Sequence, residues 1–237
     1  MPRVRLAALI AVAGLAAGCR TVQWPAEVPA RIELSGTPFY PQDAFQCGPA
    51  ALATLLGASG AHAPPSDLVD EVYIPARKGS LQTEMLAAAR QRHRIPYLLE
   101  PRFDALLAQL GDGRPVLVLL NLGVRSWPIW HYAVVIGYER DAGRMLLRSG
   151  TTARARMSLR RFLGAWDRAD HWGFVALRPA ELPRPATASR YAAAVADFER
   201  IDPHAALRAY EAGMARWPEL GLAQVAARRA RRGSCAQ

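Results

Sequence analysis

The sequence predicts an α+β fold in which helices from the first half of the chain pack on one antiparallel sheet. Apolar residues recur at helical spacing between residues 47 and 93, which indicates helices. From residue 97 onward, short apolar runs alternate with turns, which indicates strands. Helices followed by strands are typical of α+β proteins, and two further helical segments near the C-terminus predict a short α-helical hairpin.

Three helices are predicted in the first half of the chain. The first spans residues 47 to 58 and has leucines at helical spacing. The second follows a Pro-Pro pair, and Ser66 is its expected N-cap. The third runs from about Ser80 to His93 and ends before Pro96, because the residue before a proline disfavours helical geometry.

Strands and further helices complete the predicted domain. The run Val116 to Asn121 has no polar alternation, which indicates a strand buried on both faces. The other predicted elements are a strand at 97–99, a helix at 103–110, a hairpin of 132–138 with 144–148, a helix at 159–167 and a strand at 172–177. A Pro-rich linker at 180–189 precedes helices predicted at 191–200 and 203–215.

Composition indicates an ordinary globular protein. Of the 237 residues, 51% are hydrophobic and 21% charged, which excludes a disordered chain and a multi-pass membrane protein. The net charge of +10 comes almost wholly from arginine, because Lys78 is the only lysine. These arginines are mostly scattered and form no basic motif interleaved with aromatic residues, so no nucleic-acid partner is predicted.

The N-terminus predicts a lipid anchor. Two arginines precede an apolar run that is too short to span a bilayer, so residues 1–18 are predicted to be a signal peptide. The sequence LAAGC resembles the lipobox of bacterial lipoproteins, which implies diacylation of Cys19 and a tether over 19–35. The sorting rule of Gram-negative lipoproteins then implies an outer-membrane lipoprotein facing the periplasm. An ordinary signal peptide with an incidental cysteine is the alternative.

Cys47 is the predicted nucleophile because it stands at the start of a helix. Unpaired N–H groups and the helix dipole favour a thiolate there, so the pKa of the Cys47 thiol is expected to be lowered. The alternative is a small buried hydrophobe that only packs in the core. Cys235 lies in a polar tail, and no structural disulfide is expected.

A thiol nucleophile needs a base, and His131 is the predicted one. It sits where a glycine-containing loop meets a strongly apolar strand, with His171 as the reserve candidate. Gln42 and the backbone N–H of Cys47 are the predicted oxyanion donors. The loop from Trp127 to Trp130 either lines the substrate pocket or covers the core. Metal-ligand spacing and a glycine-rich phosphate loop are both absent from the sequence, so no metal or cofactor is predicted.

Three motifs carry a family resemblance: FYPQDAFQCGPAALATLL, PVLVLLNLG and WHYAVVIGY. Together they resemble the papain-like, bacteriocin-processing (double-glycine) cysteine peptidase family, and in particular a lipoprotein branch with a C-terminal tetratricopeptide-like extension. The resemblance implies a papain-like cysteine peptidase domain over 36–179, a helical tail over 190–237, and peptide or protein substrates. It implies Cys47 as nucleophile, His131 as base and Gln42 as oxyanion donor.

The sequence departs from that family at the third member of the site. Ser149 stands where the family has an aspartate, so Ser149 is the candidate that orients His131 without a charge. The main hypothesis is a peptidase that forms a thioester on Cys47. One alternative is a catalytically impaired peptide-binding or assembly lipoprotein whose C-terminal helices hold a protein partner. Another is an acyl- or amide-transferring enzyme of the same cysteine class.

The C-terminal segment has two interpretations. The sequence AALRAYEAGMARWPE looks like half of a tetratricopeptide repeat, which cannot bury its own apolar face. The segment therefore docks on the domain or on a partner. A hairpin that packs against the main domain only for stability is the alternative.

Overall fold

The computed structural model describes residues 24, 25, 27–42 and 46–218. The predicted signal peptide, the predicted lipidation site Cys19 and the tail cysteine Cys235 lie outside the described residues. None of the helices in the described part of the chain is long and apolar enough to cross a membrane.

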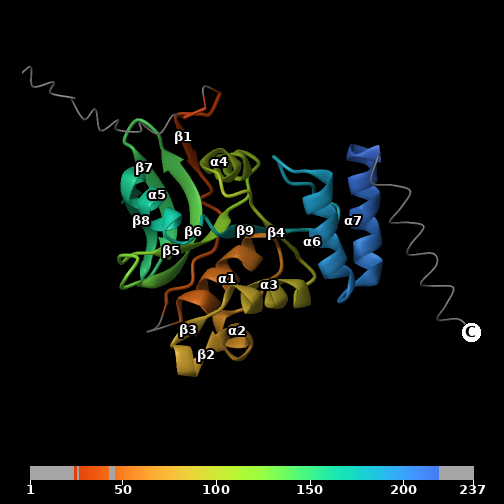
Figure 1. Ribbon diagram of the computed structural model, residues 1–237, viewed down its shortest axis with the longest axis horizontal. Coiled ribbons are helices and arrows are strands. Elements are labelled where there is room, and N and C mark those ends of the chain that lie inside the picture. The colour runs from red at the N-terminus through yellow and green to blue at the C-terminus, as the bar shows by residue number, and fades with distance from the viewer. Residues whose placement is uncertain (1–23, 26, 43–45, 219–237) are drawn as a thin grey trace, which may run out of the picture.

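The structure confirms the α+β fold (Figure 1). In the described residues, one antiparallel seven-stranded sheet has the order β4-β9-β5-β6-β7-β8, with β1 also pairing with β6. Its strands are β1 (Arg31–Glu33), β4 (Ile95–Leu98), β5 (Val116–Asn121), β6 (Trp130–Glu139), β7 (Arg144–Ser149), β8 (Thr152–Ser158) and β9 (Gly173–Leu177). A separate two-stranded sheet joins β2 (Tyr73–Ile74) to β3 (Gly79–Ser80).

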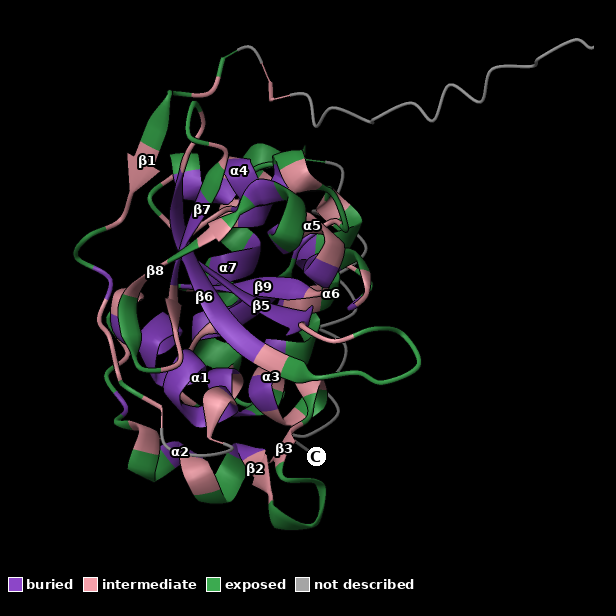
Figure 2. Cartoon of the chain, turned by 90° about the vertical axis from the view of Figure 1, so that its left-hand side faces the viewer, coloured by how far each residue is buried: buried purple, intermediate pink, exposed green. Residues whose placement is uncertain are grey.

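Helices cover both faces of the large sheet. They are α1 (Cys47–Ala58), α2 (Pro65–Val72), α3 (Gln82–Gln91), α4 (Phe103–Gly111), α5 (Leu159–Asp167), α6 (Ala188–Glu199) and α7 (Pro203–Arg216), with a 3-10 turn at Pro75–Arg77. Along β5, Leu117 and Leu119 pack in one core with α1 to α3, while Val116, Val118 and Leu120 pack in a second core with α4 to α7. The prediction that this strand is buried on both faces is confirmed (Figure 2).

Helix α1 is the most deeply enclosed helix of the first half of the chain. It begins at Cys47 as predicted, and every residue from Gly48 to Gly57 is buried. It packs on the face of the sheet formed by Tyr132, Val134 and Ile136 of β6. Burial of the whole helix fixes both its position and its rotation, so its first residue has a defined place beside the start of β6.

Two predicted helix starts are wrong. Helix α2 begins at Pro65 rather than after Ser66, because proline is preorganised for the first turn of a helix. Helix α3 begins at Gln82 rather than Ser80, because Ser80 pairs with Tyr73 in the β2–β3 hairpin. Sequence periodicity did not reveal this hairpin, whose strands have two residues each.

Two strands of the sheet were not predicted. Strand β1 lies inside the predicted tether 19–35, so the end of that segment belongs to the sheet instead. Strand β8 is an edge strand with alternating arginines, a pattern without the apolar residues that identify a strand in sequence. One ion-pair network joins the two, because the Arg154 guanidinium on β8 donates to Glu33 on β1 and to Glu139 on β6.

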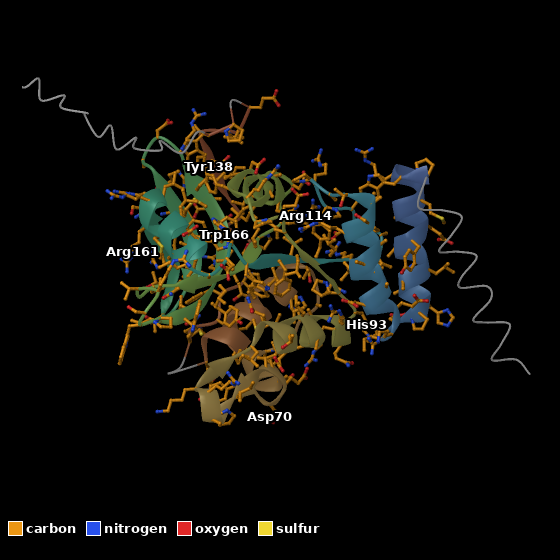
Figure 3. The ribbon with its side chains drawn as sticks, in the orientation of Figure 1. Asp70, His93, Arg114, Tyr138, Arg161 and Trp166 are labelled. Carbon is orange, nitrogen blue, oxygen red and sulfur yellow. The ribbon has the colours of Figure 1, made fainter. Side chains whose placement is uncertain are left out.

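Helices α6 and α7 form the predicted hairpin and pack on the domain. Tyr191 and Phe198 of α6 are fully buried in the same core as β4 and α4. The Tyr191 hydroxyl donates to the carbonyl oxygen of Ala209 over 3.1 Å, which joins the two helices. His93 after α3 lies beside the α6–α7 turn, with its Nδ1 2.8 Å from the Asp202 carboxylate (Figure 3). The hairpin begins at residue 188, inside the predicted linker 180–189.

Candidate active site

A cavity of about 660 Å³ brings Gln42, Cys47 and His131 together. Cys47 comes from the start of α1, His131 from the start of β6, and Gln42 from the segment that precedes α1. On one side the cavity is bounded by the β2–β3 hairpin and on the other by the start of β6. Three residues from three different segments of the chain therefore line one cavity.

The electrostatic environment of Cys47 differs from the sequence-based expectation. Burial raises the pKa of the Cys47 thiol above its ordinary value, although backbone N–H groups of Tyr132, Gly48 and Cys47 itself favour the thiolate. The expected lowering by the helix N-terminus is wrong, because loss of water around a charged sulfur outweighs those N–H groups. At neutral pH the resting sulfur is therefore a thiol.

His131 is held by Ser149. The His131 Nε2 lies 2.8 Å from the Ser149 Oγ, within hydrogen-bonding distance. Burial lowers the pKa of the His131 imidazole, so this ring is neutral at neutral pH. In the tautomer whose Nε2–H donates this hydrogen bond to the Ser149 hydroxyl, the other ring nitrogen, Nδ1, carries the free lone pair that a general base requires.

The turn between β7 and β8 positions two of the predicted residues. Ser149 is the last residue of β7, and Gly150 follows with a φ of +59°, a conformation that favours glycine. The carbonyl oxygen of Gly150 accepts a hydrogen bond from the backbone N–H of Gln42 over 3.2 Å. The same turn therefore holds the partner of His131 and the backbone of the segment that carries Gln42.

Ser80 is a residue of the cavity that sequence reasoning missed as part of the site. Its Oγ is buried and has no hydrogen-bond partner among the described residues, while its carbonyl oxygen accepts from the Tyr132 hydroxyl over 3.2 Å. Its side chain fills the space beside Gly48, where an added Cβ would lie 2.1 Å from the Ser80 Oγ. Glycine after Cys47 is thus required by close packing with β3.

The reserve base does not belong to this cavity. His171 packs its ring against Trp166, with 4.8 Å between the ring centroids, and is not among the residues that line the cavity. Trp130, in contrast, lines the cavity and is 53% exposed, and Trp127 is 78% exposed. The interpretation of this loop as a cover for the core is therefore wrong.

Comparison with known proteins identifies the domain. A sequence profile described as the Peptidase_C39 like family matches residues 35–173, which is more than half of the chain. The chain belongs to this family. The predicted family resemblance is thereby confirmed for the C39-like domain, whereas the lipoprotein branch and the tetratricopeptide-like extension stay predictions. No curated protein matches the sequence.

A solved structure of a C39-like protein shares the fold. A protein from Bacillus anthracis described as a C39-like peptidase is similar with a TM-score of 0.52 and 15% identity, over 62% of this chain and 98% of that chain. The peptidase domain of Streptococcus ComA, a bifunctional ABC transporter of a quorum-sensing pathway, has a TM-score of 0.48, 20% identity, and coverage of 60% and 98%. A double-glycine motif protease from an AMS/PCAT transporter, solved with its leader peptide, has a TM-score of 0.44, 17% identity, and coverage of 59% and 89%.

Gly48→Ala is expected to destabilise the C39-like domain by about 1–3 kcal/mol, because the new methyl group overpacks Ser80. Urea unfolding followed by tryptophan fluorescence measures the change. In a Ser80→Gly background the same substitution is expected to lose most of this effect, since the atoms it meets are gone. Equal effects of Gly48→Ala in both backgrounds would contradict the proposed contact.

The pH dependence of stability is expected to contain a contribution from His131. Its folded-state pKa lies below the ordinary 6.5, so the unfolded chain binds the proton more readily, and stability falls as pH decreases through 6.5. His131→Gln removes this part of the loss. Urea midpoints between about pH 8 and pH 5 measure it.

The matched control for this measurement is His62→Gln, because His62 is exposed and does not line the cavity. It is expected to keep the pH dependence of the parent chain. If His131→Gln and the parent lose stability equally on acidification, the lowered pKa of His131 is refuted.

Proposed function

We propose that this chain is a cysteine peptidase that hydrolyses peptide bonds through a thioester on Cys47. The observation that carries the proposal is the arrangement of the cavity. Cys47 and His131 line the same space, and the Nε2 of His131 lies within hydrogen-bonding distance of Ser149. The mechanism uses the tautomer in which Nε2–H donates to Ser149 and Nδ1 acts on the thiol. Membership of the C39-like family supports the same reaction class.

In this mechanism the resting pair is neutral. As the Cys47 sulfur attacks the scissile carbonyl, His131 takes the thiol proton and becomes an imidazolium. The Gln42 side chain and the Cys47 backbone N–H stabilise the oxyanion of the tetrahedral intermediate. His131 then protonates the leaving amine, the carbon–nitrogen bond breaks, and a thioester remains. Water, deprotonated by His131, attacks the thioester and releases the carboxylic acid and the thiol.

The proposal includes a lipid anchor. The LAAGC sequence supports diacylation of Cys19, which would tether the peptidase to the outer membrane with the domain in the periplasm. Metabolic labelling with palmitate tests the anchor, because Cys19→Ser should abolish incorporation. Persistent labelling of that variant would refute it.

Labelling with a thiol-directed acylating probe tests the activated pair. The purified protein is expected to react with the probe at Cys47, and His131→Ala is expected to slow acylation by about a hundredfold or more, because the base is lost. Mass spectrometry of the intact protein measures the rate. Screening the protein against a peptide library, with Cys47→Ala as the inactive control, tests hydrolysis itself.

The matched control for the labelling experiment is His62→Ala, which removes an exposed histidine that does not line the cavity. It is expected to label at the parent rate. Equal labelling of the parent chain and the His131→Ala variant would show that Cys47 is an ordinary thiol, and the peptidase proposal would fail.

A second candidate function is a catalytically impaired peptide-binding or assembly lipoprotein, in which α6 and α7 hold a protein partner. The uncharged Ser149 beside His131 is the observation that favours it. If the peptidase is competent as it stands, Ser149→Ala should lower kcat/KM by about fivefold, the effect of losing a hydrogen bond of about 1 kcal/mol.

Ser149→Asp distinguishes the two functions. A carboxylate would stabilise the imidazolium and raise the pKa of His131, so the acidic limb of the pH–rate profile should move to higher pH. Hydrolysis that occurs only in the Ser149→Asp variant would identify the natural chain as the impaired form. Hydrolysis by the parent chain that falls in Ser149→Ala would identify it as a peptidase.

A further inference from the structure

The connection between β5 and β6 displays large apolar side chains to solvent. Exposed fractions are 59% for Val124, 78% for Trp127, 55% for Ile129 and 53% for Trp130. We call these four residues the apolar surface. Figure 2 shows the connection as an exposed loop that extends beyond the ends of β5 and β6. A group of apolar residues this exposed is typical of a binding site rather than of an inert surface.

The loop is held rigidly from within by Asn121, which is 1% exposed. The Asn121 side-chain oxygen accepts hydrogen bonds from the backbone N–H groups of Gly123 and Ile129, each over 3.0 Å. Gly123 is required there, because an added Cβ would lie 2.3 Å from the carbonyl oxygen of Trp127. One buried amide therefore fixes both ends of the loop.

Further contacts hold the loop within itself and at its base. Val124 and Trp127 exchange backbone hydrogen bonds of 3.3 and 3.1 Å. At its base the Arg168 guanidinium donates to the carbonyl oxygen of Asn121 over 2.8 Å, and Arg125 forms an ion pair with Asp167. The apolar surface is thus preorganised, so binding a partner there requires little ordering of the loop.

The apolar surface is continuous with the cavity that holds Cys47. Trp130 belongs to both, because it lines the cavity beside His131 and also continues the exposed loop. In the proposed mechanism His131 protonates the leaving amine. The peptide segment that carries this amine must therefore lie on the His131 side of the cavity, where the apolar surface begins.

We propose that the apolar surface binds apolar side chains of the peptide segment that follows the scissile bond. The peptidase then selects substrates with a large apolar residue at the first or second position after that bond. This inference rests on the proposed peptidase activity and extends it from reaction class to substrate class. Its occupant is a peptide, because the surface continues into a cavity that the proposed reaction fills with peptide.

The test compares two sets of peptides that are identical before the scissile bond. One set carries leucine or phenylalanine at the two positions after the bond, and the other carries glycine or serine. The full chain should show a higher kcat/KM for the apolar set. In the double variant Trp127→Ser with Ile129→Ser, the ratio of kcat/KM between the two sets should fall about tenfold, the loss expected for central aromatic contacts.

The matched control is Leu207→Ser, because Leu207 is an apolar residue on α7 that is 37% exposed and does not line the cavity. This control should keep the parent ratio. If the double variant keeps the parent ratio of kcat/KM between the two peptide sets, the inference is overturned. This includes the case in which both values of kcat/KM fall by the same factor. An unchanged ratio together with lost binding to phosphatidylethanolamine–phosphatidylglycerol vesicles assigns the surface to a membrane instead.

Failure of the proposed activity would be separate from failure of this inference. If neither peptide set is cleaved by the parent chain, binding of the same peptides is measured by fluorescence anisotropy with the Cys47→Ala variant. Preferential binding of the apolar set that is lost on Trp127→Ser supports the surface as a peptide site without catalysis. Equal binding of both sets overturns the inference.

Discussion

The burial of α1 against the centre of the sheet is the constraint on which the rest of the site depends. The helix is enclosed along its whole length, so it can neither slide nor rotate without opening the core. The close contact between Gly48 and Ser80 fixes its first turn against the β2–β3 hairpin. As a result Cys47 and His131 keep their mutual position through packing, without a bond between them being needed.

The same burial determines the charge state of the pair. Removal of water raises the pKa of Cys47 and lowers that of His131, and both shifts favour the uncharged forms. An uncharged Ser149 suits such a resting state, because a buried carboxylate beside a neutral ring would lack a cation to pair with. In the proposed reaction, the imidazolium that forms on His131 would receive less stabilisation in return. Under the proposed mechanism, the site thus combines weaker stabilisation of the transition state with a resting state that holds no buried charge.

The C-terminal hairpin extends the core of the domain. Tyr191, Phe198 and Ala209 belong to the cluster that also contains β4 and α4, so the hairpin and the sheet bury each other's apolar surface. Strand β4 stands at the edge of the sheet, and α6 packs beside it. Covering an edge strand reduces its tendency to pair with another chain. The hairpin therefore has a structural role whether or not it also binds a partner.

The local sequence determined those helices and strands whose apolar residues recur at regular spacing. The helix at 159–167 and the buried strand at 116–121 lie where apolar spacing predicted them, and helix 47–58 begins at Cys47. The tertiary structure decided those strands, side-chain contacts and pKa shifts that depend on residues distant in the sequence. Strands β1 and β8 exist because β6 and β7 supply their hydrogen bonds. The contact of Ser149 with His131 follows from β7 pairing beside β6. The direction of the Cys47 pKa shift follows from burial, which no short stretch of sequence encodes.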